Sequence, residues 1–544
     1  MFICRGYFWS GFGFLGVFKR GVRRRNNTIL AVADVFLSSA GGEAMDHFTP
    51  GLQSGSRGSN PPSTKPYLPQ IREKGERALS VKIRNRDELL SHGVVDSRRV
   101  VLDVTERVLQ RLDAYERLKV FVRLDGDILH VGNHRWDLAR KRHVYVFSAG
   151  KAANHMAMAM DEILGRRLTK GVTIVKIVEE TDRYANTEVF VSGHPLPDHE
   201  GVRGSRRLLE IVDHAEKDDL FIFCMSGGST ALMAYPVDGI TLEEKMAATD
   251  TMLKSNIRVM DINTIRGHIS QMNRGRLGQR IERRGAEMIG LNIWDALDWP
   301  PIEDYGEPVT MRGTPIGPDY STFADAQRII RENGLVGRLP KSVESYIFNG
   351  TEAQETPKSI TRATYFMLNI LSDSCRYAAE VASDMGINHT ILTTSLEGES
   401  KDAGIFLASI AKEVQRFHRP IAPPCLIFSA GETSTHILDN REIKGHGGPS
   451  QELTTGFAII AREVPGACML SIDTEGTDGT TKMAGGITDS ETYRQAVAGG
   501  IDLQEALRGH ATYEALSQLG CCVFTGNTGT NLCDFNVLYI PGKE

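Results

Sequence analysis

Glycine-rich turns that carry hydroxyl or basic side chains are the segments of this 544-residue chain best suited to chemistry. Four of them adjoin apolar runs: SAGKAA (148–153), SGGSTA (226–231), EGTDGTT (475–481) and TGNTGTN (525–531). Free backbone N–H groups in such turns bind phosphate or carboxylate. One such turn can be only a tight bend, but four in one chain favour an anion site. The expected ligand contacts are Gly150, Ser226, Gly227, Gly228, Ser229, Thr230, Thr528 and Asn531.

Lys151 is the basic residue most suited to a phosphate or carboxylate. It directly follows an apolar run and falls in the first turn of an expected helix, where the helix dipole disfavours a cation. An anion that bridges Lys151 and the helix N-terminus would resolve this conflict. The alternative is a solvated lysine. The segment is not a Walker A motif, because Gly150-Lys151 is followed by alanine and lacks the upstream glycine.

Two further segments hold side chains that could contact an acidic ligand. The segment GHPLPD places His194 and Asp198 in a loop stiffened by two prolines, although a lone histidine is also often a satisfied structural group. The segment NTIRGHISQMNRGRLG gathers Arg266 with other basic residues. It is either a solvated basic helix or a cationic cluster for a carboxylate- or phosphate-bearing ligand.

Three acidic residues lie among glycines beyond an apolar run near the carboxyl terminus. Asp473, Glu475 and Asp478 fall in the segment DTEGTDGTTKMAGG. Carboxylates placed in this way could hold magnesium or accept a proton from a substrate. They could also serve only as caps of Asx-type turns.

The elements that must position these residues alternate between strands and helices. HVYVFSAG and DLFIFCMS are typical of buried strands, and KAANHMAMAMDEILG and SRRLLEIVDHA of helices. This alternation predicts an α/β fold with a Rossmann-like, mostly parallel sheet covered by helices on both faces. Ligands of such sheets bind beyond the carboxyl ends of the strands, where the glycine-rich turns fall.

The chain is long enough for two domains. Residues 1–75 are expected to be a disordered leader and linker, because residues 46–75 are rich in Gly, Ser and Pro. We predict an amino-terminal α/β domain over 76–418 and a smaller carboxyl-terminal α/β domain over 419–544. The active site is expected in the cleft between these domains.

Composition narrows the partners and the compartment. The net charge of −5 gives no reason to expect nucleic acid or a membrane as partner, and a homodimer is compatible with the sequence. Eight scattered cysteines without a CxxC pair favour a reducing compartment, which we take to be the cytoplasm. The basic, acid-free leader is either a targeting segment, which would imply a mitochondrial location, or an unstructured leader with Met45 as the true start.

The motifs, in their order along residues 80–544, resemble the type 2 glycerate kinase family with its carboxyl-terminal MOFRL domain. The matching motifs are Gly150-Lys151-Ala152-Ala153, His194-Pro195-Leu196-Pro197-Asp198, Ser226-Gly227-Gly228, the set Asn263, Arg266 and Ser270, the segment Pro318–Ala326, and the later AGET, GGPSQE, GTDGTT and TGNTGTN segments.

The resemblance implies a kinase that uses ATP and magnesium to phosphorylate the 2-hydroxyl of glycerate or a related sugar acid. It implies catalytic roles for Lys151, Asp198, Arg266 and Asp478, and a metal site at Asp478 and Glu475. The implied contacts to substrate and nucleotide are the turn residues given above together with His194, Asn263 and Glu452.

The sequence also departs from the family pattern. Ser229 and Thr230 replace a Gly-Ser pair, Asn273 replaces a lysine, and His446 and Pro449 replace two arginines. These changes predict a divergent member with a different preferred acid. A catalytically weak ligand-binding homologue is one alternative. A hydroxypyruvate reductase is another, and its only dinucleotide-like segment is GFGFLG in the leader.

Overall fold

The computed structural model describes residues 81–255, 257–297, 299–437 and 443–542. The expected leader and linker and the GFGFLG segment lie outside them. Within the described residues, no helix combines the length and the apolar character needed to cross a membrane.

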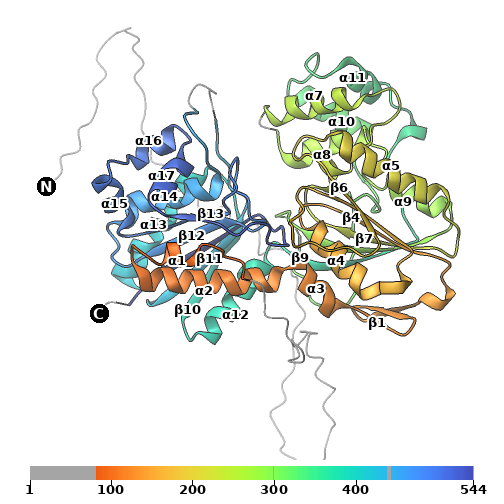
Figure 1. Cartoon of the computed structure of the whole chain (residues 1–544). Coiled ribbons are helices and arrows are strands. Elements are labelled where there is room, and N and C mark those ends of the chain that lie inside the picture. The colour runs from red at the N-terminus through yellow and green to blue at the C-terminus, as the bar shows by residue number, and fades with distance from the viewer. Residues whose placement is uncertain (1–80, 256, 298, 438–442, 543–544) are drawn as a thin grey trace, which may run out of the picture. The chain divides into compact units, whose positions relative to one another are not determined.

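The first sheet contains six parallel strands in the order β6-β5-β4-β7-β8-β9 (Figure 1). They are β4 (Val144–Ala149), β5 (Lys170–Val175), β6 (Thr187–Val191), β7 (Leu220–Met225), β8 (Glu287–Trp294) and β9 (Ala363–Ile370). Side chains alternate between the two faces of a strand. Val144 and Val146 therefore pack in one apolar cluster, and Phe147 and Ala149 in another.

Helices cover both faces of this sheet, as the sequence predicts. The helices are α3 (Ala114–Phe121), α4 (Ala153–Leu164), α5 (His199–Asp213) and α9 (Arg276–Arg283). Met156 of α4 shares a cluster with Val146, whereas Leu208 of α5 and Ile281 of α9 share the other with Phe147. The parallel α/β prediction is confirmed for the amino-terminal part.

Further helices lie in the long connections between the last strands of this sheet. They are α6 (Ser229–Leu232), α7 (Leu242–Leu253) and α8 (Val259–His268) after β7, and α10 (Phe323–Glu332) and α11 (Lys341–Phe348) after β8. The helices α7, α8, α10 and α11 lie together in Figure 1, and their buried apolar side chains form a cluster of their own.

The second sheet is mixed and has the order β10-β11-β15-β12-β13-β14. Its strands are β10 (Asn388–Leu396), β11 (Cys425–Gly431), β12 (Cys468–Asp473), β13 (Gly485–Asp489), β14 (Cys522–Val523) and β15 (Asp534–Ile540). The β10–β11 pair is parallel and the other pairs are antiparallel. On one face, α13 (Ser400–Phe417) and α14 (Pro449–Ala461) approach closely, because Gly404 faces the Leu453 carbonyl.

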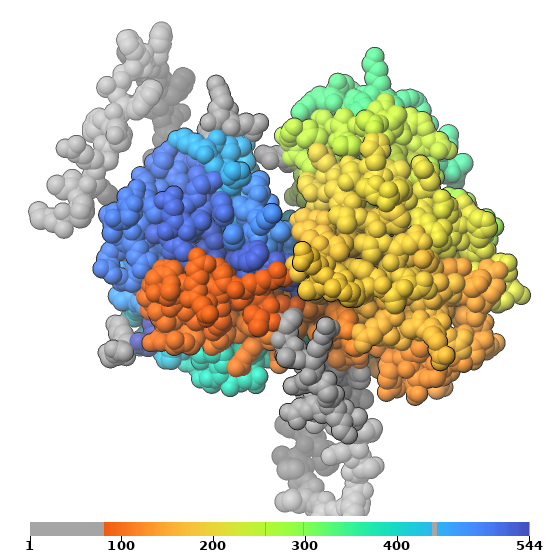
Figure 2. All heavy atoms as spheres, in the orientation of Figure 1, coloured from red at the N-terminus to blue at the C-terminus, as the bar shows by residue number. Residues whose placement is uncertain are grey.

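The expected domain boundary between residues 418 and 419 does not match the membership of the second sheet. The strand β10 precedes that boundary, yet it pairs with β11 through the crossover helix α13. The helices α2 (Val95–Leu112) and α12 (Asp373–Asp384) also pack on this sheet. In Figure 2 the orange residues that include α2 border the blue carboxyl-terminal residues. A parallel pair needs a crossover, so β10, α13 and β11 form one unit of the second sheet.

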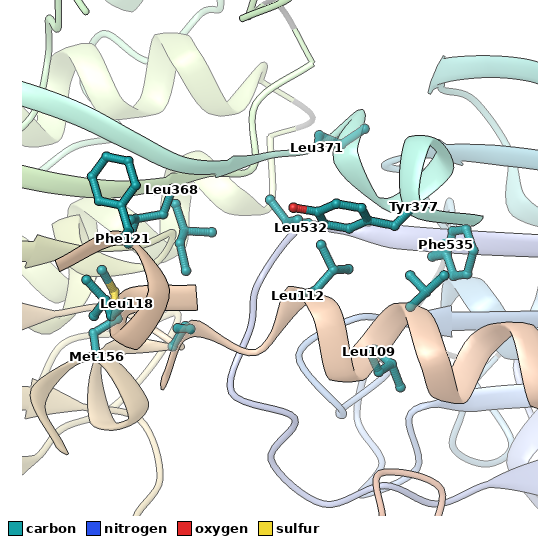
Figure 3. Close-up of a cluster of buried hydrophobic side chains, with 14 of the residues drawn as sticks. Leu109, Leu112, Leu118, Phe121, Met156, Leu368, Leu371, Tyr377, Leu532 and Phe535 are labelled. Atoms are coloured by element: carbon teal, nitrogen blue, oxygen red, sulfur yellow. The ribbon is translucent and has the colours of Figure 1, made fainter. Parts of the chain in front are cut away.

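One apolar cluster includes side chains from both sheets. Figure 3 shows Leu112 of α2, Phe121 of α3, Met156 of α4, Leu368 of β9 and Phe535 of β15 within it. The remaining elements are α1 (Arg86–Leu89), β1 (Val122–Asp125), β2 (Ile128–Val131), β3 (His134–Asp137), α15 (Thr492–Ala498), α16 (Leu503–Arg508), α17 (Thr512–Gln518) and the 3-10 helices Leu138–Arg140, Gly165–Arg167 and Glu352–Gln354.

Candidate active site

Lys151 lies at the end of the first sheet and pairs with a carboxylate from the second. Its Nζ is 2.8 Å from Glu475 Oε2, and the Nζ of Lys176 is 2.8 Å from Glu475 Oε1. Burial opposes the charged form of Lys151, but Glu475 and Asp473 outweigh it and raise the pKa of Lys151. Burial would also raise the pKa of Glu475, but the two lysines lower it to about 2. The ionised forms therefore prevail, and this ion-pair cluster joins the strand ends of the first sheet to the second sheet.

The turns at Gly150 and Ser226 brace each other. The Lys151 N–H donates to the Gly227 carbonyl at 2.9 Å, and the Ala152 N–H donates to Ser226 Oγ at 3.0 Å. A Cβ on Gly150 would lie 2.2 Å from Ser226 Oγ, and the φ of Gly150 is 135°. Gly150 and Ser226 thus hold two adjacent strand ends together, and the N–H groups of Lys151 and Ala152 are used inside the protein.

The free groups of this region belong to the second half of the SGGST turn. The backbone N–H groups of residues 227–230 donate to no other residue in the described part of the chain. The Ser229 and Thr230 side chains are only partly buried, and their hydroxyls make no hydrogen bond to a described residue. A ligand could therefore bind to this half of the turn.

Asp295 is a central acidic residue that the sequence reasoning missed. It follows β8, and its Oδ2 accepts a hydrogen bond of 2.6 Å from Asn531 Nδ2. Gly227 packs so closely that an added Cβ would lie 1.7 Å from this oxygen. Burial raises the pKa of Asp295 despite the nearby Lys151. The only available signal was an acid at the carboxyl end of an apolar strand.

Arg266 and Lys245 are buried cations without an anionic partner in the described structure. The Nε and Nη2 of Arg266 and the Nζ of Lys245 make no hydrogen bond there, although the two side chains are 7% and 0% exposed. Burial lowers the pKa of Arg266 to about 10, and burial together with Arg266 lowers that of Lys245 to about 7. Because unpaired buried cations are costly, Arg266 is suited to an incoming anion. Asn263 Oδ1 is only 3.5 Å from Arg266 Nη1.

The basic segment around Arg266 is therefore not a solvated helix. His268 is fully buried, Arg274 pairs with Asp319 at 2.9 Å, and Arg276 donates to the Gln354 carbonyl. Arg274 and Arg276 support neighbouring loops, so within this segment Arg266 is the arginine with donor atoms left for a ligand.

The two polar side chains of the HPLPD loop have separate roles. The imidazole of His194 lies against Gly228, and burial and then Lys151 lower its pKa to about 3. It is therefore neutral near pH 7 and close to the free turn. Asp198 instead caps α5: it accepts hydrogen bonds from the N–H groups of Gly201 and Gly193 at 3.0 and 2.7 Å. This capping role takes up the carboxylate that the sequence placed in catalysis.

Asp478 and Glu475 do not fit a shared magnesium ion. Asp478 accepts hydrogen bonds from the Ser450 and Gln451 N–H groups at 3.1 and 2.9 Å, at the start of α14. Burial raises its pKa to about 7. Both oxygens of Glu475 face lysines. Among the described residues, no three acidic, histidine or cysteine side chains converge on a metal position.

The other expected contacts are supporting residues. Glu452 is 2% exposed and its Oε1 pairs with His510 Nδ1 at 2.8 Å. The Thr528 carbonyl accepts a hydrogen bond from Lys82 Nζ, and its hydroxyl donates to the Thr474 carbonyl. Asn531 positions Asp295, as described above.

The two sheets thus bring together lysines, carboxylates, an arginine with two unpaired donor atoms and free backbone N–H groups among the described residues. Two family models match the chain: residues 100–348 match a domain of unknown function, DUF4147, and residues 425–534 match the MOFRL family. The chain belongs to the glycerate kinase family that combines these two domains. The resemblance drawn from the motifs is thus confirmed.

Individual relatives cover most of the chain. A glycerate 2-kinase of Pyrococcus horikoshii is 33% identical over 83% of this chain and 99% of its own length. A D-glycerate 2-kinase of Thermotoga maritima is 35% identical over 72% of this chain and 89% of its own. The crystal structure of glycerate kinase from Thermotoga maritima superposes with a TM-score of 0.66 at 32% identity, over 81% of this chain and 99% of that one.

Proposed function

We propose that this protein transfers the γ-phosphoryl group of ATP to the 2-hydroxyl of glycerate or a closely related sugar acid. The observation that carries the proposal is that two cations, Lys151 at the strand ends and Arg266, both lie close enough to His194 to influence its pKa. The Nε and Nη2 of Arg266 have no hydrogen-bond partner among the described residues. One cation suits a phosphoryl group and the other a carboxylate. The names of the glycerate 2-kinase relatives support the same reaction.

Arg266 is the group proposed to hold the acceptor acid. A guanidinium binds a carboxylate through two parallel hydrogen bonds, and the Nε and Nη2 of Arg266 are the two donors left without a partner among the described residues. The neutral His194 imidazole would donate or accept one further hydrogen bond to a hydroxyl of the acid. These contacts would fix the 2-hydroxyl relative to Lys151.

Lys151 and the free turn are proposed to stabilise the transferring group. Phosphoryl transfer depends mainly on alignment and charge neutralisation. The substrate oxygen bonds to the γ-phosphorus, the bond to the bridging oxygen of ADP breaks, and the hydroxyl proton passes to the Asp295 carboxylate. The raised pKa of Asp295 suits it to accept that proton. The N–H groups of residues 227–230 would bind the phosphoryl oxygens.

Asp473 is the residue proposed to hold magnesium, which leaves Asp295 to accept the proton. Burial, and then Glu475, raise the pKa of Asp473, so a cation beside this carboxylate would relieve an unfavourable arrangement. Magnesium commonly takes one or two protein carboxylates and completes its shell with phosphate oxygens and water. When bound, it would neutralise charge on the nucleotide phosphates.

The departures from the family pattern bear on substrate choice and rate. His446 pairs with Glu514 at 2.9 Å, and Pro449 opens α14, so neither supplies the positive charge of the arginine it replaces. Ser229 and Thr230 add bulk and hydroxyls beside the free N–H groups. We infer that the preferred acid differs from glycerate in size or hydroxyl pattern. A weakly catalytic, ligand-binding protein is the second candidate, because of the two missing arginines.

The test is ADP release with ATP and magnesium over a panel of hydroxy acids of three to six carbons. We expect turnover with at least one acid, and at least a hundredfold loss of kcat/KM in Lys151→Met and Arg266→Met. The Lys217→Met variant, which replaces an exposed lysine just before the amino end of β7, is the matched control. If the wild type binds ATP but releases no ADP with any acid of the panel, the weakly catalytic, ligand-binding protein would be favoured. Oxidation of NADH with hydroxypyruvate would instead indicate a reductase.

A further inference from the structure

Glu475 is clamped between two lysines from neighbouring strands of the other sheet. Lys151 follows β4 and Lys176 follows β5, and each Nζ is 2.8 Å from a different oxygen of the Glu475 carboxylate. The Thr477 hydroxyl donates to Glu475 Oε1 at 2.6 Å and accepts from Lys176 Nζ at 2.9 Å. The Glu475 side chain is 7% exposed, whereas those of Lys151 and Lys176 are 19% and 27% exposed. The lysines therefore remain accessible beside a buried acid.

The spacing of the two ammonium groups suits a phosphate. Both ammonium groups contact the same carboxylate. Their separation is therefore at most about the width of that carboxylate plus the lengths of the two contacts to it. A phosphoryl group presents oxygens at a similar spacing and carries more negative charge. Lysine binds phosphates as a point charge and needs no fixed fork geometry. A phosphoryl group could therefore take the place of the carboxylate without rearrangement of the strands.

The family arginines that are missing from this chain make the second lysine more important. With His446 paired to Glu514 and Pro449 at the start of α14, positive charge for a polyphosphate has to come from other residues. Lys176 is suited to supply it, because it shares an acid with Lys151. The sequence reasoning did not single out Lys176.

We propose that Lys176 is a second phosphate-binding cation of this site and that the Glu475 carboxylate occupies the phosphate position until a nucleotide displaces it. The inference rests on the proposed function and names the ligand of this part of the site as the polyphosphate of a nucleoside triphosphate. Glu475 must leave on binding, because a carboxylate and a phosphate between the same lysines would repel each other. Glu475 thus competes with the nucleotide, and it keeps the two lysines paired when no nucleotide is bound.

If Glu475 competes with phosphate, its removal should raise phosphate affinity, whereas a merely structural Glu475 would have no such effect. Binding of inorganic tripolyphosphate and of magnesium-free ATP is measured by calorimetry for the full chain. Glu475→Gln removes the competing charge, so we expect at least about threefold tighter binding. Lys176→Met removes one cation, so we expect about tenfold weaker binding, with most of the affinity restored in Lys176→Arg. A merely structural Lys176 would give no rescue specific to charge and no gain in the glutamine variant.

The chain offers a matched control at the opposite end of β5. Glu188 is also held between two cations: its Oε1 is 3.2 Å from Lys170 Nζ, and its Oε2 is 3.0 Å from Arg207 Nε. Glu188→Gln and Lys170→Met disturb the same kind of pair at the amino end of that strand. We expect both to leave tripolyphosphate affinity unchanged. Melting temperatures of all variants show which of them are folded.

The outcomes separate this inference from the proposed function. Weaker or unchanged binding in a folded Glu475→Gln variant, unchanged binding in Lys176→Met, or no binding of tripolyphosphate to the wild type overturns the inference. The expected affinity pattern without phosphorylation of any acid upholds the inference and contradicts the proposed kinase activity. Kinase turnover by the wild type, together with an unchanged tripolyphosphate affinity in Lys176→Met, would uphold the proposed kinase activity and overturn the inference.

Discussion

At Gly227, one added methyl group should greatly reduce the catalytic rate while the protein still folds. A Cβ there would lie 1.7 Å from Asp295 Oδ2 and 2.3 Å from Asn531 Nδ2, where ordinary contacts begin near 3.4 Å. The φ of Gly227 lies outside the left-handed region, so alanine adds no backbone strain. In Gly227→Ala the Asp295 carboxylate must therefore retreat by well over 1 Å and lose its hydrogen bond to Asn531.

The size of the effect follows from this displacement. A catalytic group misplaced by about 1 Å can cost roughly a hundredfold in rate. Overpacking of this kind costs only about 1–3 kcal/mol of stability. We therefore expect Gly227→Ala to fold, to melt a few degrees lower, and to lose at least about a hundredfold in kcat. The Gly499→Ala variant, where the nearest atom would be 3.4 Å from the new Cβ, is the control for a harmless methyl group.

The assay is steady-state ADP release, combined with a double-mutant cycle. Asp295→Ala should itself lose about 10²–10⁴-fold if Asp295 accepts the substrate proton. Adding Gly227→Ala to Asp295→Ala should then cost little more, because the displaced group is already absent. Full activity in a folded Gly227→Ala protein would refute the role given to Asp295. So would losses that multiply in the double variant.

Two further predictions concern buried charges. Lys245→Met should stabilise the protein by about 2 kcal/mol at pH 6, because it removes a buried amine without a partner. The folded pKa of Lys245, about 7, lies below its unfolded value, so the penalty is fully present below pH 7 and shrinks as pH rises towards 10.5; urea unfolding at pH 6 and pH 9 should show the smaller gain at pH 9. Arg98→Met should destabilise by about 3–5 kcal/mol, because Arg98 Nε and Asp489 Oδ2 are 2.6 Å apart and both side chains are fully buried. Guanidinium unfolding measures that loss, and a change below about 1 kcal/mol would contradict the expectation that Asp489 is left as an uncompensated buried charge.

The strands and turns of the first sheet could be predicted from the sequence because they are local. Apolar runs bounded by glycine specify β4 and β7, and the position of Lys151 after β4 follows directly. The partners of Lys151 could not be predicted in the same way. Glu475 meets it only because β12 ends opposite β4, an arrangement set by tertiary packing.

Most site residues that the sequence did not predict correctly also depend on tertiary packing. Asp295 stands in a long irregular segment without a motif, and strand order alone brings it beside Gly227. Asp198 carries the right side-chain type for catalysis, but its carboxylate accepts from backbone N–H groups within its own loop and helix start. The Asp478 carboxylate accepts from backbone N–H groups that lie 27 and 28 residues away in the chain. Sequence patterns identify which residue types are present. Which of their atoms remain unpaired depends on neighbours distant in the chain.

The most direct test of the account is the phosphorus NMR spectrum of the product formed from ATP, magnesium and D-glycerate or the best acid of the panel. Arg266 is proposed to hold the carboxylate so that the adjacent 2-hydroxyl faces the phosphoryl group. We therefore predict a new phosphate signal split into a doublet by the single proton on carbon 2, absent in Arg266→Met. A triplet from phosphorylation of a terminal CH₂OH group, or no new signal while ATP binds, would contradict the account.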